Sequence, residues 1–220
     1  MIALLQQSPL TFIILAVVLV FSLVLHELGH GYSALRAGDP TARNHGRLTF
    51  NPIKHLDPIG TLLLLLVGFG WAKPVPIDPS RFGHPRRDLF VVSVAGIVIN
   101  LVLAAVFGLA LRLLYGIDPV AVDAMLYGGQ AVGFNGIIAL LLMFAGSINL
   151  VLALFNLLPI PPLDGSKILQ SFLPERYHHF FWQLEQYSWL FFILIFFVLR
   201  EPVGRLLGQA QQAFFGFFLG

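Results

Sequence analysis

The chain has 220 residues, of which 57% are hydrophobic and only 11% are charged. Soluble globular domains carry about 25% charged residues. This composition, with a mean hydropathy of +0.84, therefore indicates a protein that crosses the membrane several times. Cysteine is absent, which excludes disulfides, thiolate zinc sites and cysteine nucleophiles. The net charge is +2 and the basic residues are spread over loops between apolar runs, so no nucleic-acid partner is expected.

A helix needs about 20 apolar residues to cross the hydrocarbon core of a bilayer. Four stretches meet this requirement: residues 9–35, 89–115, 134–158 and 180–199. Residues 61–71, "TLLLLLVGFGW", are too short for an ordinary crossing. They predict a re-entrant or short inserted segment, with a span through a thin membrane as the alternative. Residues 206–220 are predicted to lie in the membrane interface as an amphipathic tail.

The long first loop predicts a small β-like element. In "HGRLTFNPIKHLDPIG", residues Arg47 to Phe50 form a short β-like stretch, which an Asn-Pro turn and an Asp-Pro turn close. A strand there would offer its backbone to an extended substrate by β-augmentation. The predicted fold class is therefore an all-α polytopic membrane protein. It is a bundle of about four spanning helices with a re-entrant or short apolar segment and a small β-like membrane-associated loop.

The charges of the loops predict the orientation. Eight of the thirteen Lys and Arg residues lie between Arg36 and Asp88, whereas residues 116–133 contain none. Cytoplasmic loops carry an excess of Lys and Arg. We therefore expect a multi-pass protein of the cell membrane, with its N-terminus outside and the end of its first span toward the cytoplasm.

His26, Glu27 and His30 lie at the end of the first span, where ionisable residues are costly and indicate a functional site. On an α-helix, residues i and i+4 lie about 40° apart, so the two imidazoles can share one metal ion. This H-E-x-x-H spacing is typical of zinc metalloproteases, in which two neutral histidines bind the metal and the glutamate acts as general base. A pair of core histidines bonded to neighbouring helices is the simpler alternative.

A catalytic zinc site takes a third protein ligand. Asp164, in "FNLLPIPPLDGSKIL", directly follows the third span, where three prolines stop the helix and an Asp-Gly turn directs a carboxylate back. The first and third spans end on the same predicted side of the membrane, so Asp164 is expected near His26 and His30. An ordinary Asp-Gly turn remains the alternative.

These segments resemble the site-2 protease family of intramembrane zinc metalloproteases. The likeness rests on "HELGHGYSA" within a spanning helix and "NLLPIPPLDGSKIL" after the third span. "GRLTFNPIKHLDPIGTLL" and "GWAKPVPIDPSRF" are similar to first-loop segments of compact bacterial and archaeal members. The expected domains are a metalloprotease core at residues 1–170 and a C-terminal spanning helix with an interfacial tail at residues 171–220. No PDZ-like or CBS-like domain is expected.

The resemblance implies one Zn²⁺ per chain, held by His26, His30 and Asp164, with Glu27 as the catalytic base. It implies that Asn156 helps to hold the substrate carbonyl or its oxyanion, and that Asn100, in "SVAGIVINL", has a similar role. An interhelical hydrogen bond is the alternative for each asparagine. The implied activity is hydrolysis of peptide bonds in or near the transmembrane segment of a protein or peptide substrate in the lipid bilayer. A homo-oligomer is left open.

Two functions from other classes fit parts of this pattern. A metal transporter would use intramembrane His and Glu to pass ions, but it predicts ligands along several spans, and only the first span contains histidine. A catalytically inactive scaffold that binds membrane helices would be expected to have lost Glu27 or a metal ligand. Both kinds of residue are present, so the sequence favours a protease.

Overall fold

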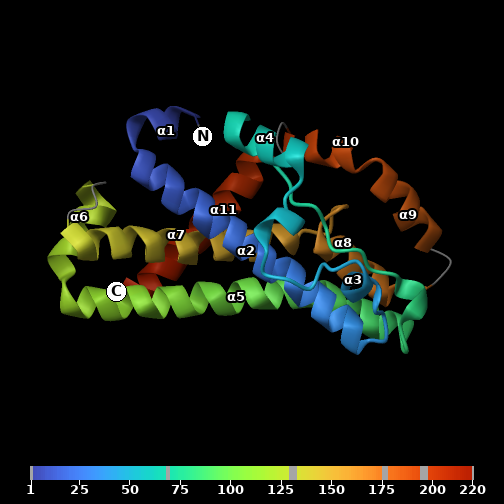
Figure 1. The fold of residues 1–220 in the computed structure, drawn as a ribbon. Helices are drawn as coiled ribbons and strands as arrows, with labels where there is room; N and C mark the ends of the chain where they lie inside the picture. The colour runs from blue at the N-terminus through green and yellow to red at the C-terminus, as the bar shows by residue number, and fades with distance from the viewer. Residues whose placement is uncertain (1, 68–69, 129–132, 175–177, 194–197, 220) are drawn as a thin grey trace.

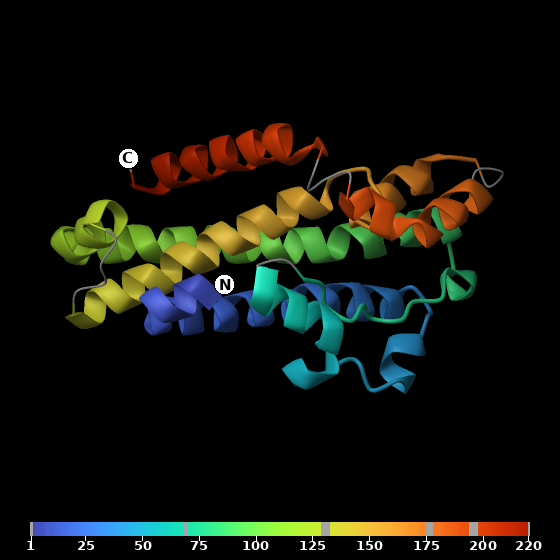
Figure 2. The same ribbon diagram turned by 90° about the horizontal axis from the view of Figure 1, so that it is seen from above.

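The structure is a computed structural model that describes residues 2–67, 70–128, 133–174, 178–193 and 198–219. Three of the described helices are long and apolar enough to cross a membrane: α2 (Pro9–Arg36), α5 (Pro85–Ile117) and α7 (Gly133–Asn156). They lie side by side, and α5 packs against both α2 and α7 (Figure 1, Figure 2). The first three predicted spans are therefore confirmed.

The local sequence explains where the long helices begin. Pro9 and Pro85 occupy the first turns of α2 and α5, where a missing backbone N–H costs no helical hydrogen bond. Ser8 caps α2, because its hydroxyl oxygen accepts a hydrogen bond from the backbone N–H of Thr11. Ile13 and Val17 on the outer face of α2 are 55% and 61% exposed, as suits side chains that face lipid rather than water.

A glycine brings α2 and α5 close together where His26 and His30 lie. A Cβ added at Gly29 would lie 2.7 Å from a side-chain carbon of Ile99 and 3.2 Å from the backbone oxygen of Ala95. Small residues at membrane helix contacts allow such close packing of the two backbones. The segment of α2 that carries His26 and His30 is thereby pressed against α5.

The fourth predicted span, residues 180–199, is not found as one helix in the described part of the chain. α9 (His178–Gln186) ends and α10 (Ser188–Ile193) begins around Tyr187, and residues 194–197 lie outside the described residues. The hydroxyl of Ser188 donates to the backbone oxygen of Glu185 at this break. Side chains that bond to the backbone in this way compete with a continuous helix.

The last helix, α11 (Arg200–Leu219), packs against α5 and α7. Figure 2 shows α11 alongside α7, away from α2. A Cβ added at Gly108 of α5 would lie 2.7 Å from the ring of Phe218 and 2.8 Å from that of Phe214, so α11 presses its aromatic face on α5. The interfacial position of residues 206–220 stays a prediction.

Short helices complete the described structure: α1 (Ile2–Gln7), α3 (Thr41–Asn44), α4 (Pro58–Val67), α6 (Pro119–Gly128), α8 (Asp164–Phe172) and two 3-10 turns at Pro52–Lys54 and Pro79–Arg81. The ten residues of α4 span about 15 Å. This is too short to cross the hydrocarbon core, in agreement with the length argument for this apolar segment.

The strand predicted at Arg47 to Phe50 is wrong. These residues form bends, and the β-structure of the described residues is one isolated bridge between Leu56 and Ala72. Arg47 is buried, and its guanidinium donates to the backbone oxygen of Lys73. The segment is therefore tied into the loop. A strand depends on its neighbours, which local β-propensity cannot supply.

Candidate metal centre

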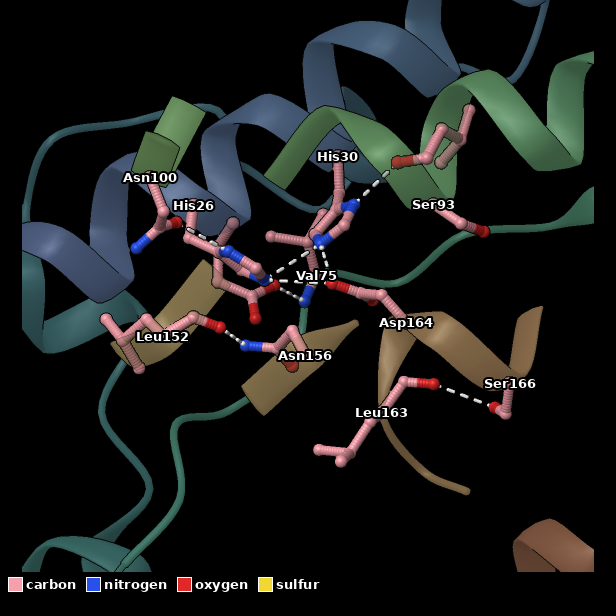
Figure 3. A network of polar contacts seen from close by, with 12 residues as sticks. His26, His30, Val75, Ser93, Asn100, Leu152, Asn156, Leu163, Asp164 and Ser166 are labelled. Atoms are coloured by element: carbon pink, nitrogen blue, oxygen red, sulfur yellow. Dashed lines mark hydrogen bonds and ion pairs between the residues drawn. The ribbon is translucent and has the colours of Figure 1, made fainter. Parts of the chain in front are cut away.

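Three side chains from distant parts of the chain converge at one point. His26 and His30 lie one turn apart on α2, and Asp164 is the first residue of α8 (Figure 3). The two Nε2 atoms are 3.0 Å apart, and Asp164 Oδ2 lies 3.2 Å from that of His26 and 3.1 Å from that of His30. All three residues are buried. The structure thus brings the predicted ligands together.

This arrangement fits a zinc ion. Asp164 Oδ2 is buried, and despite the nearby imidazoles it accepts no well-oriented hydrogen bond from the described residues, which is costly unless a cation compensates it. Four ligands at about 2.0–2.2 Å from zinc in a tetrahedron lie about 3.3–3.6 Å from one another. The observed 3.0–3.2 Å is slightly shorter, so a small outward shift of the side chains would fit the ion. Two imidazoles and a carboxylate also form the ligand set of known catalytic zinc sites.

The chain returns sharply after α7, and this return positions Asp164. A Cβ added at Gly165 would lie 2.3 Å from the backbone oxygen of Leu157, so glycine is needed where the chain passes itself this closely. Burial opposes ionisation of Asp164, but the adjacent His30 and His26 outweigh burial and hold the pKa of the carboxyl below its ordinary value. A lowered pKa favours the ionised carboxylate, which is the form that binds a metal.

Each histidine is held by a hydrogen bond at its other ring nitrogen. His30 Nδ1 lies 2.7 Å from the backbone oxygen of Val92, and His26 Nδ1 lies 2.7 Å from Asn100 Oδ1. Carbonyl oxygens only accept, so Nδ1 carries a proton in both rings, and Nε2 is the ring nitrogen that faces Asp164. Partners of this kind orient the histidine ligands of zinc sites.

A chain of buried amides determines the orientation of Asn100. Asn149 Nδ2 donates to the backbone oxygen of Ala145 at 2.8 Å and to Ser22 Oγ at 2.9 Å. Since the Ala145 carbonyl only accepts, Asn149 presents its Oδ1 to Asn100, whose Nδ2 donates at 3.1 Å. Asn100 then presents its own oxygen to His26. Because Asn100 is 0% exposed, it lies behind His26, and this placement gives no support to the predicted contact with substrate.

Glu27 and Asn156 are not among the three converging ligands. Glu27 Oε2 accepts a hydrogen bond of 2.7 Å from the backbone N–H of Val75, in a part of the first loop that is neither helix nor strand. Asn156 is the last residue of α7, and its Nδ2 donates to the backbone oxygen of Leu152 at 2.9 Å (Figure 3). Both side chains are partly exposed, so both are accessible to a molecule at the site.

Gly96 of α5 is a position at the site that the sequence analysis missed. A Cβ there would lie 2.5 Å from His30 Nε2 and 2.6 Å from His26 Cε1. The imidazole rings therefore lie directly against the backbone of α5. Gly96 precedes Asn100 by four residues, so the two lie on one face of α5, and this spacing could have indicated from the sequence that Gly96 is near the site.

Gly96→Ala is expected to abolish stoichiometric zinc binding, because the added methyl group occupies space next to both imidazoles. Elemental analysis of the purified protein in detergent measures the effect. Gly116→Ala is the matched control on the same helix, since a Cβ there meets no atom within 4 Å, and it should retain zinc. A full zinc content in Gly96→Ala would contradict the close packing of the ligands on α5.

Comparison with known proteins gives consistent matches. The model of Peptidase family M50 matches residues 14–199. The chain is 42% identical to "Putative zinc metalloprotease YwhC" of Bacillus subtilis over 184 residues, which cover 83% of this chain and 79% of the relative. It is 30% identical to Rip2 of Mycolicibacterium smegmatis, which has the same description, over 89% of this chain and 70% of the relative. No solved structure matches the chain.

Proposed function

Because this chain belongs to peptidase family M50, we propose that His26, His30 and Asp164 hold its zinc ion and that Glu27 is its catalytic base. The chain is an intramembrane zinc metalloprotease, which hydrolyses peptide bonds in or near transmembrane segments. The observation that carries the assignment of the ligands is the convergence of three buried ligand atoms within 3.0–3.2 Å. No comparison supports a metal transporter or an inactive scaffold.

When bound, zinc supplies Lewis-acid chemistry, which polarises a peptide carbonyl and makes water easier to deprotonate. Glu27 takes the proton of the attacking water and passes it to the leaving amine. Its Oε2 accepts from the N–H of Val75, so we assign the proton transfer to Oε1. This hydrogen bond also fixes the direction of the carboxylate on α2.

Asn156 and Asn100 have different roles in this proposal. The side-chain amide of Asn156 has two N–H donors, and its bond to Leu152 uses one of them. The second donates to the oxygen of the scissile carbonyl as negative charge develops there. Asn100 instead orients His26, and Asn149 keeps Asn100 in the required direction.

β-augmentation by the first loop is not part of the proposal, because the strand at residues 47–50 is absent. Residues 73–76, which lie beside Glu27, cannot take the place of this strand in pairing with a substrate. The N–H of Lys73 donates to His55 and that of Val75 to Glu27, while Pro74 and Pro76 have no N–H. Residues 73–76 therefore have no donor left for an added strand.

The helices and the family establish that the chain lies in a membrane, whereas its orientation is a proposal. Three helices long enough to span, together with the family, make this a membrane protein. We place the N-terminus outside and the metal centre toward the cytoplasm of a cell membrane, because the basic residues of the chain gather in the first loop. The substrate is a transmembrane protein or peptide. A homo-oligomer and the division at residue 170 stay predictions.

Cleavage of a membrane-inserted single-span peptide by the purified protein tests the function. A chelator should abolish cleavage, and zinc should restore it while magnesium should not, because imidazole ligands suit zinc and magnesium prefers oxygen ligands. The cleavage products are identified by mass spectrometry. Undiminished cleavage after zinc is removed, as verified by elemental analysis, would contradict the zinc-dependent mechanism.

A further inference from the structure

We propose that a groove between α2 and α7 binds the apolar side chains next to the scissile bond of the substrate, an inference that rests on the proposed function. The groove has a volume of about 450 Å³. This groove, called the α2–α7 groove below, is lined mainly by apolar residues, among them Leu19, Leu23, Trp71, Leu152, Phe155 and Gly204, and the charged residue Arg200 also lines it. They come from α2, the first loop, α7 and α11.

The wall formed by α2 is a continuation of the Glu27 face. Leu23 and Leu19 precede Glu27 by four and eight residues, so they lie about 40° and 80° from it around the helix axis and about 6 and 12 Å along that axis. An extended peptide with its scissile bond at Glu27 would therefore place its neighbouring residues along Leu23 and Leu19. These positions are on the side of Glu27 away from the end of α2.

The wall formed by α7 leads to Asn156 in the same way. Leu152 lies one turn before Asn156, and its backbone oxygen accepts a hydrogen bond of 2.9 Å from Asn156 Nδ2. Phe155 is the residue directly before Asn156. Glu27 and Asn156 do not line the α2–α7 groove themselves, but residues about one helical turn or less before each of them do. This continuity points to the substrate as its occupant.

The chemistry of the α2–α7 groove matches part of a transmembrane segment. Most of its lining is apolar, as is usual for a site that binds apolar side chains. Thr61 also lines it, and the buried hydroxyl of Thr61 has no hydrogen-bond partner among the described residues. An unwound peptide needs partners for its backbone in lipid, and this hydroxyl offers one.

A larger cavity, of about 570 Å³, lies on another side of α2 and is less suited to substrate. Leu25, Leu28 and Tyr32 line it. These positions are rotated by about 100–160° from Glu27 around the helix axis. A peptide bound there would have α2 between its backbone and the catalytic base. The position of Glu27 therefore selects the smaller groove.

Gly204→Trp tests the α2–α7 groove by filling it. A Cβ at Gly204 meets no atom within 4 Å and Gly204 lines the groove, so the position accepts a side chain and the indole is expected to occupy the groove. The probe is a synthetic single-span peptide with about 20 leucine and alanine residues, interrupted by a glycine–asparagine pair, in phosphatidylcholine vesicles. The rate of cleavage by the zinc-loaded full chain should fall about tenfold or more, the effect of losing one large apolar contact.

Gly216→Trp is the matched control, because it lies on the same helix, also meets no atom within 4 Å and does not line the groove. Its rate should stay near that of the original protein. Both variants should retain zinc, since α11 contributes none of the proposed ligands. An equal rate in Gly204→Trp and Gly216→Trp would overturn the proposal.

A second measurement detects binding without cleavage. In the Glu27→Gln background, the photo-reactive residue p-benzoylphenylalanine replaces Leu207, which lines the α2–α7 groove, or its neighbour Leu206, which is 53% exposed and does not. The peptide should cross-link at position 207 and not at 206. Equal cross-linking at both positions, or cross-linking at 207 to lipid alone, would overturn the groove while the proteolytic function stands. Cross-linking at 207 without cleavage by the original protein would instead support the groove and refute the proposed function.

Discussion

Glu27→Gln is expected to lower the rate of peptide cleavage by about 10²–10⁴-fold, the usual contribution of a general base, while zinc stays bound. Glutamine cannot take a proton from water. Its side-chain oxygen can still accept the hydrogen bond that Val75 donates to Glu27 at 2.7 Å, so the fold around the site should persist. The rate is measured with a membrane-inserted peptide, and the zinc content of the same preparation is measured by elemental analysis.

Asp78→Asn is the control for this change, because it also replaces a carboxylate with the matching amide, but in the first loop rather than on α2. Asp78 caps a 3-10 turn away from the metal centre, where its carboxylate accepts from Ser80. Its rate of cleavage should remain near that of the original protein. Substantial turnover by Glu27→Gln, with full zinc content, would show that another group takes the proton.

Asp164→Ala is expected to lower zinc affinity and activity together. The Oδ2 of Asp164 lies 3.2 and 3.1 Å from the Nε2 atoms of His26 and His30, so its removal leaves two ligands where a catalytic zinc site has three. Loss of a residue that only supports a ligand costs about 10–100-fold in metal affinity, and loss of a ligand should exceed this range. Zinc affinity is measured by competition with a chromophoric chelator.

Asp57→Ala and Asp78→Ala serve as matched controls that remove a carboxylate elsewhere. The Asp57 carboxylate accepts from the backbone N–H of Gly60 at 2.7 Å, and that of Asp78 accepts from Ser80 at 3.1 Å. Neither belongs to the cluster of His26, His30 and Asp164. Both variants should bind zinc normally. If Asp164→Ala retained the affinity of the original protein, the third ligand would have to be another residue.

The sequence by itself determined the features that depend on local order. The apolar lengths of α2, α5 and α7 exceed the thickness of a bilayer core, so these spans follow from composition. His26 and His30 share a helix face because four residues make slightly more than one turn. Asp164 was accessible to prediction because a proline-rich stop after the third span leaves the chain on the predicted side of the membrane where α2 also ends.

Only the tertiary structure decided the contacts between distant segments. His26 and Asn100 are 74 positions apart, and Asn149 and Ser22 are 127 apart, so no local pattern pairs them. The strand expected at residues 47–50 is absent for the same reason, because a strand forms only with a partner, and Arg47 is hydrogen-bonded to Lys73 instead.

The apolar content of residues 180–199 predicted one span, but apolar content alone cannot predict the helix break at Tyr187. The packing of helices against one another also placed Gly96 beside the imidazoles and formed the α2–α7 groove, since the position of a surface in space depends on which helices meet.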